Sequence, residues 1–400
     1  MNILFLFAQY PEDKDGSNLH KDLPDEFCRH GHGVFVATIR ERRVEKETAI
    51  SQENGRSVLR VKVGNMFDDV SKIEKALVML SMDRKLANRI REYWGDVKFD
   101  LIVGSTPWTA GDRLISDLKI HFKCPAFLIL WDIFPQNAKD LGLIKNSLIF
   151  NFFKSRELKS LKNFDHIGCM TEGNLGYISK HYPSIGKNKL SIFPLWANKS
   201  AVNRDLIQTR QELGFDDNDF ILVFGGNMGL PQNLSNVIKL ANEVRAVHEI
   251  KFLFVGKGSE TSKIKALAKE LELSNVTFLD HLERSAYEAV MLTCDVGLVS
   301  LNPKFTVPNF PSKTMDYVKF NLPILAALDK CALADYGSFI QNKAKIGLCS
   351  DAEDMVRYKE NLLSLYNDKH LYARLVNNCQ ETFEKEFNIR ANYEEIIALI

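Results

Sequence analysis

A repeated alternation of short apolar runs with longer mixed stretches constrains the fold of this chain most. In the first half the apolar runs are residues 3–8, 34–38, 58–63, 99–103, 126–130 and 166–170. The alternation restarts with runs at 220–224, 251–255, 276–279, 296–300 and 323–326. Strands that alternate with helices predict parallel sheets covered by helices on both faces. We therefore expect an α/β fold made of two doubly wound, Rossmann-like halves.

The chain has 400 residues, which favours two domains over one. The alternation breaks at residues 193–198, and the polar stretch that follows, up to residue 218, is the expected linker. We predict an N-terminal domain over residues 1–195, a C-terminal domain over 196–380, and a helix over 381–400 that packs back on the first domain. Two such domains facing across a cleft would place a ligand there, at the carboxyl ends of their strands.

Composition excludes several classes of protein. The formal net charge is +1, so no overall field attracts nucleic acid. The seven cysteines are odd in number and none is paired as Cys-x-x-Cys, which indicates reduced thiols in a cytoplasmic protein and no zinc site. The apolar run at residues 2–8 is too short for a signal peptide, and no run reaches 18 apolar residues.

The stretch at residues 309–317, Asn-Phe-Pro-Ser-Lys-Thr-Met-Asp-Tyr, has the pattern of an anion site. Pro311 ends a loop and Ser312 is a good N-cap, so a helix is expected to begin here with unpaired N–H groups. Lys313 adds a positive charge at the helix end that already favours anions. Asp316 follows on nearly the same face, where it could accept hydrogen bonds from sugar hydroxyls. The alternative is an ordinary capped helix with a solvated lysine.

Three glycine-containing turns follow predicted strands, at residues 15–18, 224–229 and 255–258. Glycine allows a backbone to approach a ligand closely. None of the three is a complete Gly-x-Gly-x-x-Gly, since Thr261 stands where the third glycine would be, and this disfavours a dinucleotide oxidoreductase. Together with the Lys313 helix, the turns indicate a site for nucleotide phosphates.

Residues 220–327 resemble the family 4 glycosyltransferases, which have the GT-B fold. The resemblance rests on FGGNMG, FLFVGKGSE, NVTFLDHLERSAYEAVMLTCDVGLVSL and FPSKTMDYVKFNLPIL, in that order and spacing. The first half is similar more loosely, through the glycine turn near residue 16, GHGV at 31–34 and WDIFP at 131–135. In detail the chain is most similar to bacterial transferases of surface-polysaccharide assembly, including amino-sugar transferases of the fucosaminyltransferase type.

The resemblance implies roles for individual residues. Asp316 would bind the ribose hydroxyls, Lys313 the diphosphate, and the backbone at Leu282 the base. The donor-binding set that it implies is Gly16, Gly226, Asn227, Met228, Gln232, Gly256, Lys257, Gly258, Leu282, Phe310, Pro311, Ser312, Lys313, Thr314 and Asp316. Asp132 would stand near the transferred sugar, which makes Asp132, Lys313 and Asp316 the expected catalytic residues. Trp108 and Asp132 would bind the acceptor, although a helix cap for Asp132 and core packing for Trp108 are open alternatives.

The sequence also departs from the family pattern. Asp316 replaces the second glutamate of the usual Glu-x7-Glu pair, and Pro308 stands in place of the first. Asn227 and Gln232 occupy the positions of the family's arginine and lysine. Similar polysaccharide transferases carry the same two amides, so we interpret them as a subgroup trait. Lys313 and Lys257 are then the expected positive charges of the site.

The implied activity is metal-independent, retaining transfer of a hexosyl group. The donor would be a UDP-sugar, expected to be an N-acetylated hexosamine, and no cofactor or metal is expected. The acceptor would be a lipid-linked saccharide, such as one on undecaprenyl diphosphate, in capsule, O-antigen or exopolysaccharide synthesis. Two alternatives remain: a UDP-sugar 2-epimerase, and a non-catalytic GT-B assembly subunit, which the missing arginine, lysine and first glutamate favour.

Two stretches, residues 66–94 and 143–162, mix apolar side chains with lysine and arginine. Helices of this composition can lie on an anionic bilayer surface, so peripheral contact with the inner face of the cell membrane is a hypothesis. The alternative is a helix whose apolar side faces the core.

Overall fold

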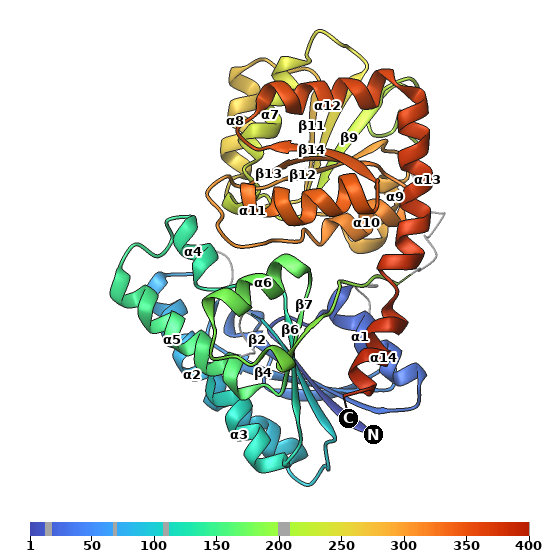
Figure 1. The fold of residues 1–400 in the computed structure, drawn as a ribbon. Coiled ribbons are helices and arrows are strands. Elements are labelled where there is room, and N and C mark those ends of the chain that lie inside the picture. Colours follow the sequence, from blue (N-terminus) through green and yellow to red (C-terminus); the bar gives the residue numbers. More distant parts are fainter. Residues whose placement is uncertain (13–17, 67–69, 107–111, 199–208, 400) are drawn as a thin grey trace. The chain divides into compact units, whose positions relative to one another are not determined.

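The structure is a computed structural model that describes residues 1–12, 18–66, 70–106, 112–198 and 209–399 (Figure 1). The chain forms two compact units. Unit 1 contains Met1–Lys139, Ile144–Pro194 and Ile389–Ile400, and unit 2 contains Asp140–Leu143 and Leu195–Asn388.

Unit 1 is built on an eight-stranded sheet with the order β3-β4-β2-β1-β5-β6-β7-β8. Its strands are β1 (Asn2–Phe7), β2 (Gly33–Glu41), β3 (Ala49–Glu53), β4 (Arg56–Val63), β5 (Leu101–Ser105), β6 (Ala126–Leu130), β7 (His166–Cys169) and β8 (Leu190–Ile192). All neighbours are parallel except β3, which pairs antiparallel with β4. The helices are α1 (Leu19–Arg29), α2 (Lys72–Trp94), α3 (Asp112–Phe122), α4 (Gln136–Asp140), α5 (Ser147–Asn163), α6 (Glu172–His181) and α14 (Ile389–Ile397).

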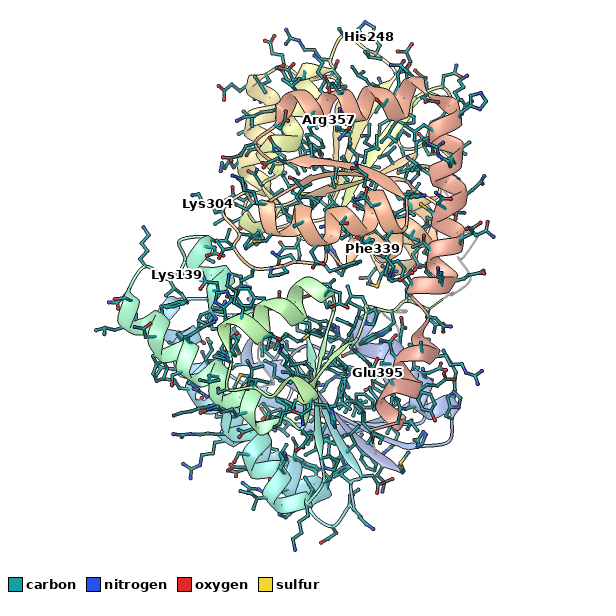
Figure 2. All side chains as sticks on the ribbon, in the orientation of Figure 1. Lys139, His248, Lys304, Phe339, Arg357 and Glu395 are labelled. Carbon is teal, nitrogen blue, oxygen red and sulfur yellow. The ribbon has the colours of Figure 1, made fainter. Side chains whose placement is uncertain are left out.

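The last helix of the chain, α14, belongs to unit 1 and packs beside α1 (Figure 1). Tyr393 stacks on the ring of His30, with the ring centres 4.1 Å apart, and its hydroxyl lies 2.9 Å from His32 Nε2. Glu395, labelled in Figure 2, accepts a hydrogen bond of 2.7 Å from Ser191 Oγ. Aromatic stacking and hydrogen bonds with distant residues therefore tie the end of the chain to the first unit.

Unit 2 has a fully parallel six-stranded sheet with the order β11-β10-β9-β12-β13-β14. The strands are β9 (Phe220–Gly225), β10 (Ile250–Val255), β11 (Val276–Leu279), β12 (Val296–Ser300), β13 (Ile324–Leu328) and β14 (Gly347–Asp351). The helices are α7 (Leu234–Glu243), α8 (Thr261–Glu270), α9 (Arg284–Met291), α10 (Lys313–Lys319), α11 (Lys330–Ala332), α12 (Met355–Asn367) and α13 (Lys369–Glu386). The strand order reverses beside β9, which pairs with β10 on one side and β12 on the other. Ligands of doubly wound sheets bind at such a switch point.

The predicted α/β fold with two doubly wound sheets is confirmed. Strands β3, β8 and β14 were not expected from the sequence, and each lies at an edge of its sheet. These three strands lack a continuous apolar run, and the three side chains of β8, for example, are all half-buried.

Each sheet carries its own core, in which strand side chains pack against the covering helices. All seven cysteines are free thiols. Burial raises the pKa of Cys169, Cys294 and Cys379 to about 12, so these thiols stay protonated at neutral pH. Within the described part of the chain, no helix combines the length and apolarity that crossing a bilayer requires.

Candidate functional site

Two glycine turns of unit 2 pack directly against each other where β9 and β10 end. The Gly226 N–H donates to the Val255 carbonyl over 3.0 Å, and the Met228 N–H donates to the Lys257 carbonyl over 2.9 Å. Gly256 has φ +134°, and a Cβ placed on it would lie 2.2 Å from the Gly226 carbonyl oxygen. The two turns therefore form one compact backbone surface that only glycine at position 256 permits.

Lys313 reaches this surface from the first turn of α10. Its Nζ donates to Gln232 Oε1 over 2.7 Å and lies 4.5 Å from the centre of the Phe224 ring. The structure thus brings together two predicted donor-binding residues that are 81 positions apart. Gln232 is neutral, so its hydrogen bond does not neutralise the ammonium, and the charge of Asp316 favours the protonated form.

The pH dependence of UDP binding is expected to report on Lys313. Burial lowers the pKa of this lysine to about 8, so its ammonium loses a proton between pH 7 and pH 9. UDP affinity should therefore fall about tenfold over that interval, since the charged fraction drops by about that factor. Calorimetric titration at the two pH values tests this, with Lys313→Met as the control whose affinity should not change with pH. A wild-type affinity that is constant over the interval would show that this ammonium does not hold the diphosphate.

The amino end of α10 differs from the expected cap. Ser312 occupies the N-cap position, but its side chain makes no capping hydrogen bond, so this part of the sequence prediction was wrong. The N–H groups of Thr314 and Met315 donate to the carbonyls of Pro311 and Ser312. Among the described residues, the N–H groups of Ser312 and Lys313 remain as the donors that could face a ligand.

Two members of the predicted donor set are part of the core. Thr314 is fully buried, and its hydroxyl lies 2.6 Å from Tyr336 Oη. Met228 is fully buried in the core of unit 2. Neither side chain is open to a nucleotide, so we assign both a role in holding the site together.

The remaining predicted side chains of unit 2 differ in exposure and in their contacts. Asn227 and Lys257 are exposed and Leu282 is half-buried. A Cβ on Gly258 would lie 2.5 Å from the carbonyl carbon of Met228 and 2.6 Å from its oxygen, so this second glycine is also required for the turns to meet. Phe310 packs within unit 2 against Phe339, which Figure 2 labels, with the ring centres 5.4 Å apart.

Asp316 is held by an arginine that the sequence analysis missed. Arg284, the first residue of α9, donates to both carboxylate oxygens, from Nη1 to Oδ2 over 2.9 Å and from Nη2 to Oδ1 over 2.5 Å. Burial opposes the charge of Arg284, but the hydrogen bonds and charge of Asp316 and the charge of Glu288 outweigh it and raise the pKa of the guanidinium. No motif links Arg284 to Asp316, because α9 and α10 meet only in the folded unit.

Asp132 belongs to unit 1 and follows β6. Its N–H and that of Trp131 both donate to Thr106 Oγ1, over 2.8 and 2.9 Å. Its side chain is exposed, and the protein around it raises the pKa of the carboxyl by desolvation. The helix-cap alternative is excluded, because α4 begins only at Gln136. Two other predicted residues, Gly16 and Trp108, lie outside the described residues.

Asp132 lines a cavity of about 80 Å³ inside unit 1, between strands and the helices α2 and α5. Its walls are mostly apolar, including Leu130 and Phe134. Arg156 also lines it and pairs with Asp83 over 3.0 Å and with Asp112 over 2.7 Å. Burial raises the pKa of Asp83 to about 6 despite this pairing.

Within the described residues, no group of three or more His, Cys, Asp or Glu side chains is placed to hold a metal ion.

The sequence of unit 2 matches the family model "Glycosyl transferases group 1" over residues 207–382. These residues form a group 1 glycosyltransferase domain. WcaI of Escherichia coli (strain K12), whose name assigns it to colanic acid biosynthesis, is 22% identical over 268 residues, 64% of each chain. WbjE of Pseudomonas aeruginosa, named as a glycosyltransferase, is 24% identical over 217 residues, 51% of each chain. The chain thus spans less than two thirds of the length of both relatives.

Solved glycosyltransferase structures share the fold of the whole chain. Sucrose-phosphate synthase of Thermosynechococcus elongatus has a TM-score of 0.77 at 15% identity and covers 100% of this chain and 98% of its own. HepE of Anabaena in complex with UDP has a TM-score of 0.69 at 14% identity, with 100% and 99% covered. WaaG, a glycosyltransferase involved in lipopolysaccharide biosynthesis, has a TM-score of 0.65 at 16% identity, with 98% of both covered. The fold is GT-B.

Proposed function

We propose that the protein is a retaining glycosyltransferase that moves a sugar from a UDP-sugar to a saccharide acceptor in polysaccharide biosynthesis. The observation that carries this proposal is the hydrogen bond from Lys313 to Gln232, beside the two glycine turns that pack together. All these residues lie within the group 1 domain. A half-buried ammonium, backbone N–H groups and close-packed glycines suit a diphosphate. The HepE complexes with UDP and the naming of WcaI for colanic acid biosynthesis support the same assignment.

The chemical task is to stabilise a departing nucleoside diphosphate. As the bond from the sugar C1 to the phosphate oxygen breaks, negative charge grows on the diphosphate, where the Lys313 ammonium and the N–H groups of Ser312 and Lys313 stabilise it. The exposed Lys257 supplies a second positive charge. The acceptor oxygen bonds to C1 on the face that the phosphate leaves, and the acceptor proton passes to the leaving phosphate. Neither a protein nucleophile nor a metal ion takes part in this scheme.

The two carboxylates have different tasks in this scheme. Asp316 accepts hydrogen bonds from the ribose hydroxyls of the donor. Asp132 orients the acceptor hydroxyl or the transferred sugar from the loop after β6. Desolvation raises the pKa of this carboxyl, and its oxygens can accept hydrogen bonds from sugar hydroxyls.

The donor class is tested by calorimetric titration of the purified protein with UDP-, GDP- and dTDP-linked sugars. A UDP-linked N-acetylated hexosamine is expected to bind best, as the resemblance to amino-sugar transferases implies. Slow release of UDP from the donor in water identifies the enzyme, whereas binding without any turnover favours a non-catalytic assembly subunit. Interconversion of the sugar nucleotide without acceptor would identify a 2-epimerase. Absence of UDP-sugar binding would overturn the proposal.

The acceptor is proposed to be lipid-linked, as on undecaprenyl diphosphate, and the protein to reach it by lying on the inner membrane surface. Helices α2 and α5 are joined by the Arg156–Asp83 pair and carry exposed apolar side chains. These are Leu77 and Leu80 on α2 and Leu148, Ile149 and Phe152 on α5, of which Leu148 is 77% exposed. Of the four basic residues of α5, Lys154 and Arg156 form ion pairs within the unit, whereas Lys159 and Lys162 are exposed and complement anionic lipid. The exposure of these side chains argues against the core-facing alternative.

Flotation with vesicles tests this surface. The protein should float with vesicles containing phosphatidylglycerol and less with pure phosphatidylcholine, and 0.5 M salt should weaken the binding, because both apolar burial and charge contribute. Replacing Leu148 and Phe152 with serine should lower the bound fraction about fivefold or more, since each loses roughly 1.5–3 kcal/mol of apolar transfer. Val356→Ser is the matched control, because Val356 is 70% exposed on α12 of unit 2. Equal flotation of both variants would remove the membrane surface from the proposal.

A further inference from the structure

Asp316 belongs to a chain of four charged side chains in unit 2. Arg284 grips both oxygens of Asp316, and its Nη2 also lies 3.0 Å from Glu288 Oε1. Lys319 Nζ donates to the same Glu288 oxygen over 2.9 Å. Glu288 and Lys319 have almost fully buried side chains, and Glu288 contacts the same Nη2 that donates to Asp316, so buried charges hold the guanidinium in place.

This geometry fixes the carboxylate of Asp316. A free aspartate can rotate about its terminal torsion, because sp³–sp² torsions are broad. A two-pronged guanidinium contact fixes the plane of the carboxylate and uses about two of its four lone-pair sites. The other sites are left for hydroxyl donors in a defined direction.

The need for such a clamp follows from the residue itself. Asp316 is one methylene shorter than the glutamate of the family pattern, and the partner carboxylate at position 308 is a proline. Because the aspartate side chain is short and no second carboxylate is present, neighbouring residues must orient it for it to bind the two ribose hydroxyls. In the structure, Arg284 is the residue that grips it with two prongs.

We propose that Arg284 is a positioning residue that orients Asp316 toward the ribose diol and so makes the protein select ribonucleotide over 2′-deoxyribonucleotide donors. The inference rests on the proposed function, because it assumes that a nucleoside diphosphate binds beside α10. It differs from a purely structural role for the ion pair. If the ion pair only held α9 and α10 together, its loss would change the stability of the protein and its affinity for every nucleotide, but not the preference for ribose over deoxyribose.

The decisive measurement is the ratio of the dissociation constants of 2′-deoxy-UDP and UDP, obtained by calorimetry. The wild-type protein should prefer UDP about tenfold or more, since a hydrogen bond to a charged group is lost with the 2′-hydroxyl. Arg284→Met should lower the preference to about threefold or less, because the carboxylate is then free to turn away. Any repulsion from the unpaired Asp316 weakens both ligands alike and cancels in the ratio. Arg284→Lys keeps the positive charge but loses the two-pronged guanidinium contact, so it should give an intermediate ratio.

Two further variants separate this role from general damage. Arg210 Nη2 contacts both carboxylate oxygens of Asp295 in the same unit, over 2.9 and 3.0 Å, so Arg210→Met removes another arginine–aspartate pair that lies outside the proposed site. It should lower the melting temperature and leave the UDP preference unchanged. Asp316→Asn should lower the preference, and adding Arg284→Met to it should lower the preference no further, because both changes act through the same contact.

The outcomes distinguish the inference from the function on which it rests. A wild-type protein that does not bind UDP overturns both. A wild-type protein that binds UDP without preferring it over the deoxy form, or an Arg284→Met variant that keeps the full preference, overturns the positioning role alone. Should Arg284→Met fail to fold, the ratio of Arg284→Lys decides: an unchanged ratio in that variant also overturns the role.

Discussion

Replacing Lys313 with methionine is expected to weaken UDP binding about tenfold or more at pH 7, equivalent to about 1.4 kcal/mol or more for a lost charge-assisted contact. The side chain is half-buried, and its ammonium meets only the neutral Gln232 amide and the Phe224 ring among the contacts described. Methionine keeps much of the apolar stem, so the packing on Phe224 should survive while the charge is lost. The effect is read by calorimetric titration with UDP.

Lys239→Met serves as the control for this change. Lys239 is exposed on α7 of the same unit, and its replacement should leave UDP affinity unchanged. If Lys313→Met bound UDP as tightly as the wild-type protein does, the diphosphate would have to be held elsewhere, and the assignment of α10 to the donor site would be wrong.

Replacing Gly256 with alanine is expected to abolish measurable UDP binding and to lower the free energy of unfolding by about 3 kcal/mol or more. Two costs combine. The backbone has φ +134°, which an L side chain rarely adopts, and the new Cβ would lie 2.2 Å from the Gly226 carbonyl oxygen. Because the obstacle is backbone, the two turns must separate, and the surface that faces the diphosphate is lost. Urea denaturation and calorimetry measure the two effects.

Gly214→Ala isolates the backbone strain from the clash. Gly214 also belongs to unit 2 and has φ +83°, but a Cβ there meets nothing within 4 Å. Its replacement should cost only about 1–2 kcal/mol and leave UDP affinity intact. Equal losses for the two variants would mean that the contact between the turns contributes nothing beyond conformational strain.

The central strands of both sheets were predictable because burial on both faces leaves a continuous apolar signature. Strands β9, β10, β12 and β13 follow this rule, and each was expected within about two residues of its bounds. The sequence also predicted that Lys313 and the two glycine turns lie at the same edge of the sheet. Each follows a strand, and the carboxyl ends of parallel strands share one edge.

Other features of the site depended on contacts that no local pattern records. Thr314 and Asp316 are two residues apart on one short helix, yet the first points to the buried Tyr336 hydroxyl and the second to Arg284. Their directions follow from how α10 is rotated against its neighbours, which only packing determines.

By itself, then, the sequence determined two doubly wound halves with glycine turns where strands end, because alternating burial and backbone conformation are local properties of the chain. Only the tertiary structure decided which side chains remain open to a ligand and which are used inside the protein. It placed Arg284 on Asp316 across 32 positions, and Lys313 on Gln232 across 81. Hydrogen bonds between residues so far apart in the sequence form only where packed elements meet, so these pairs cannot be deduced from the amino-acid sequence alone.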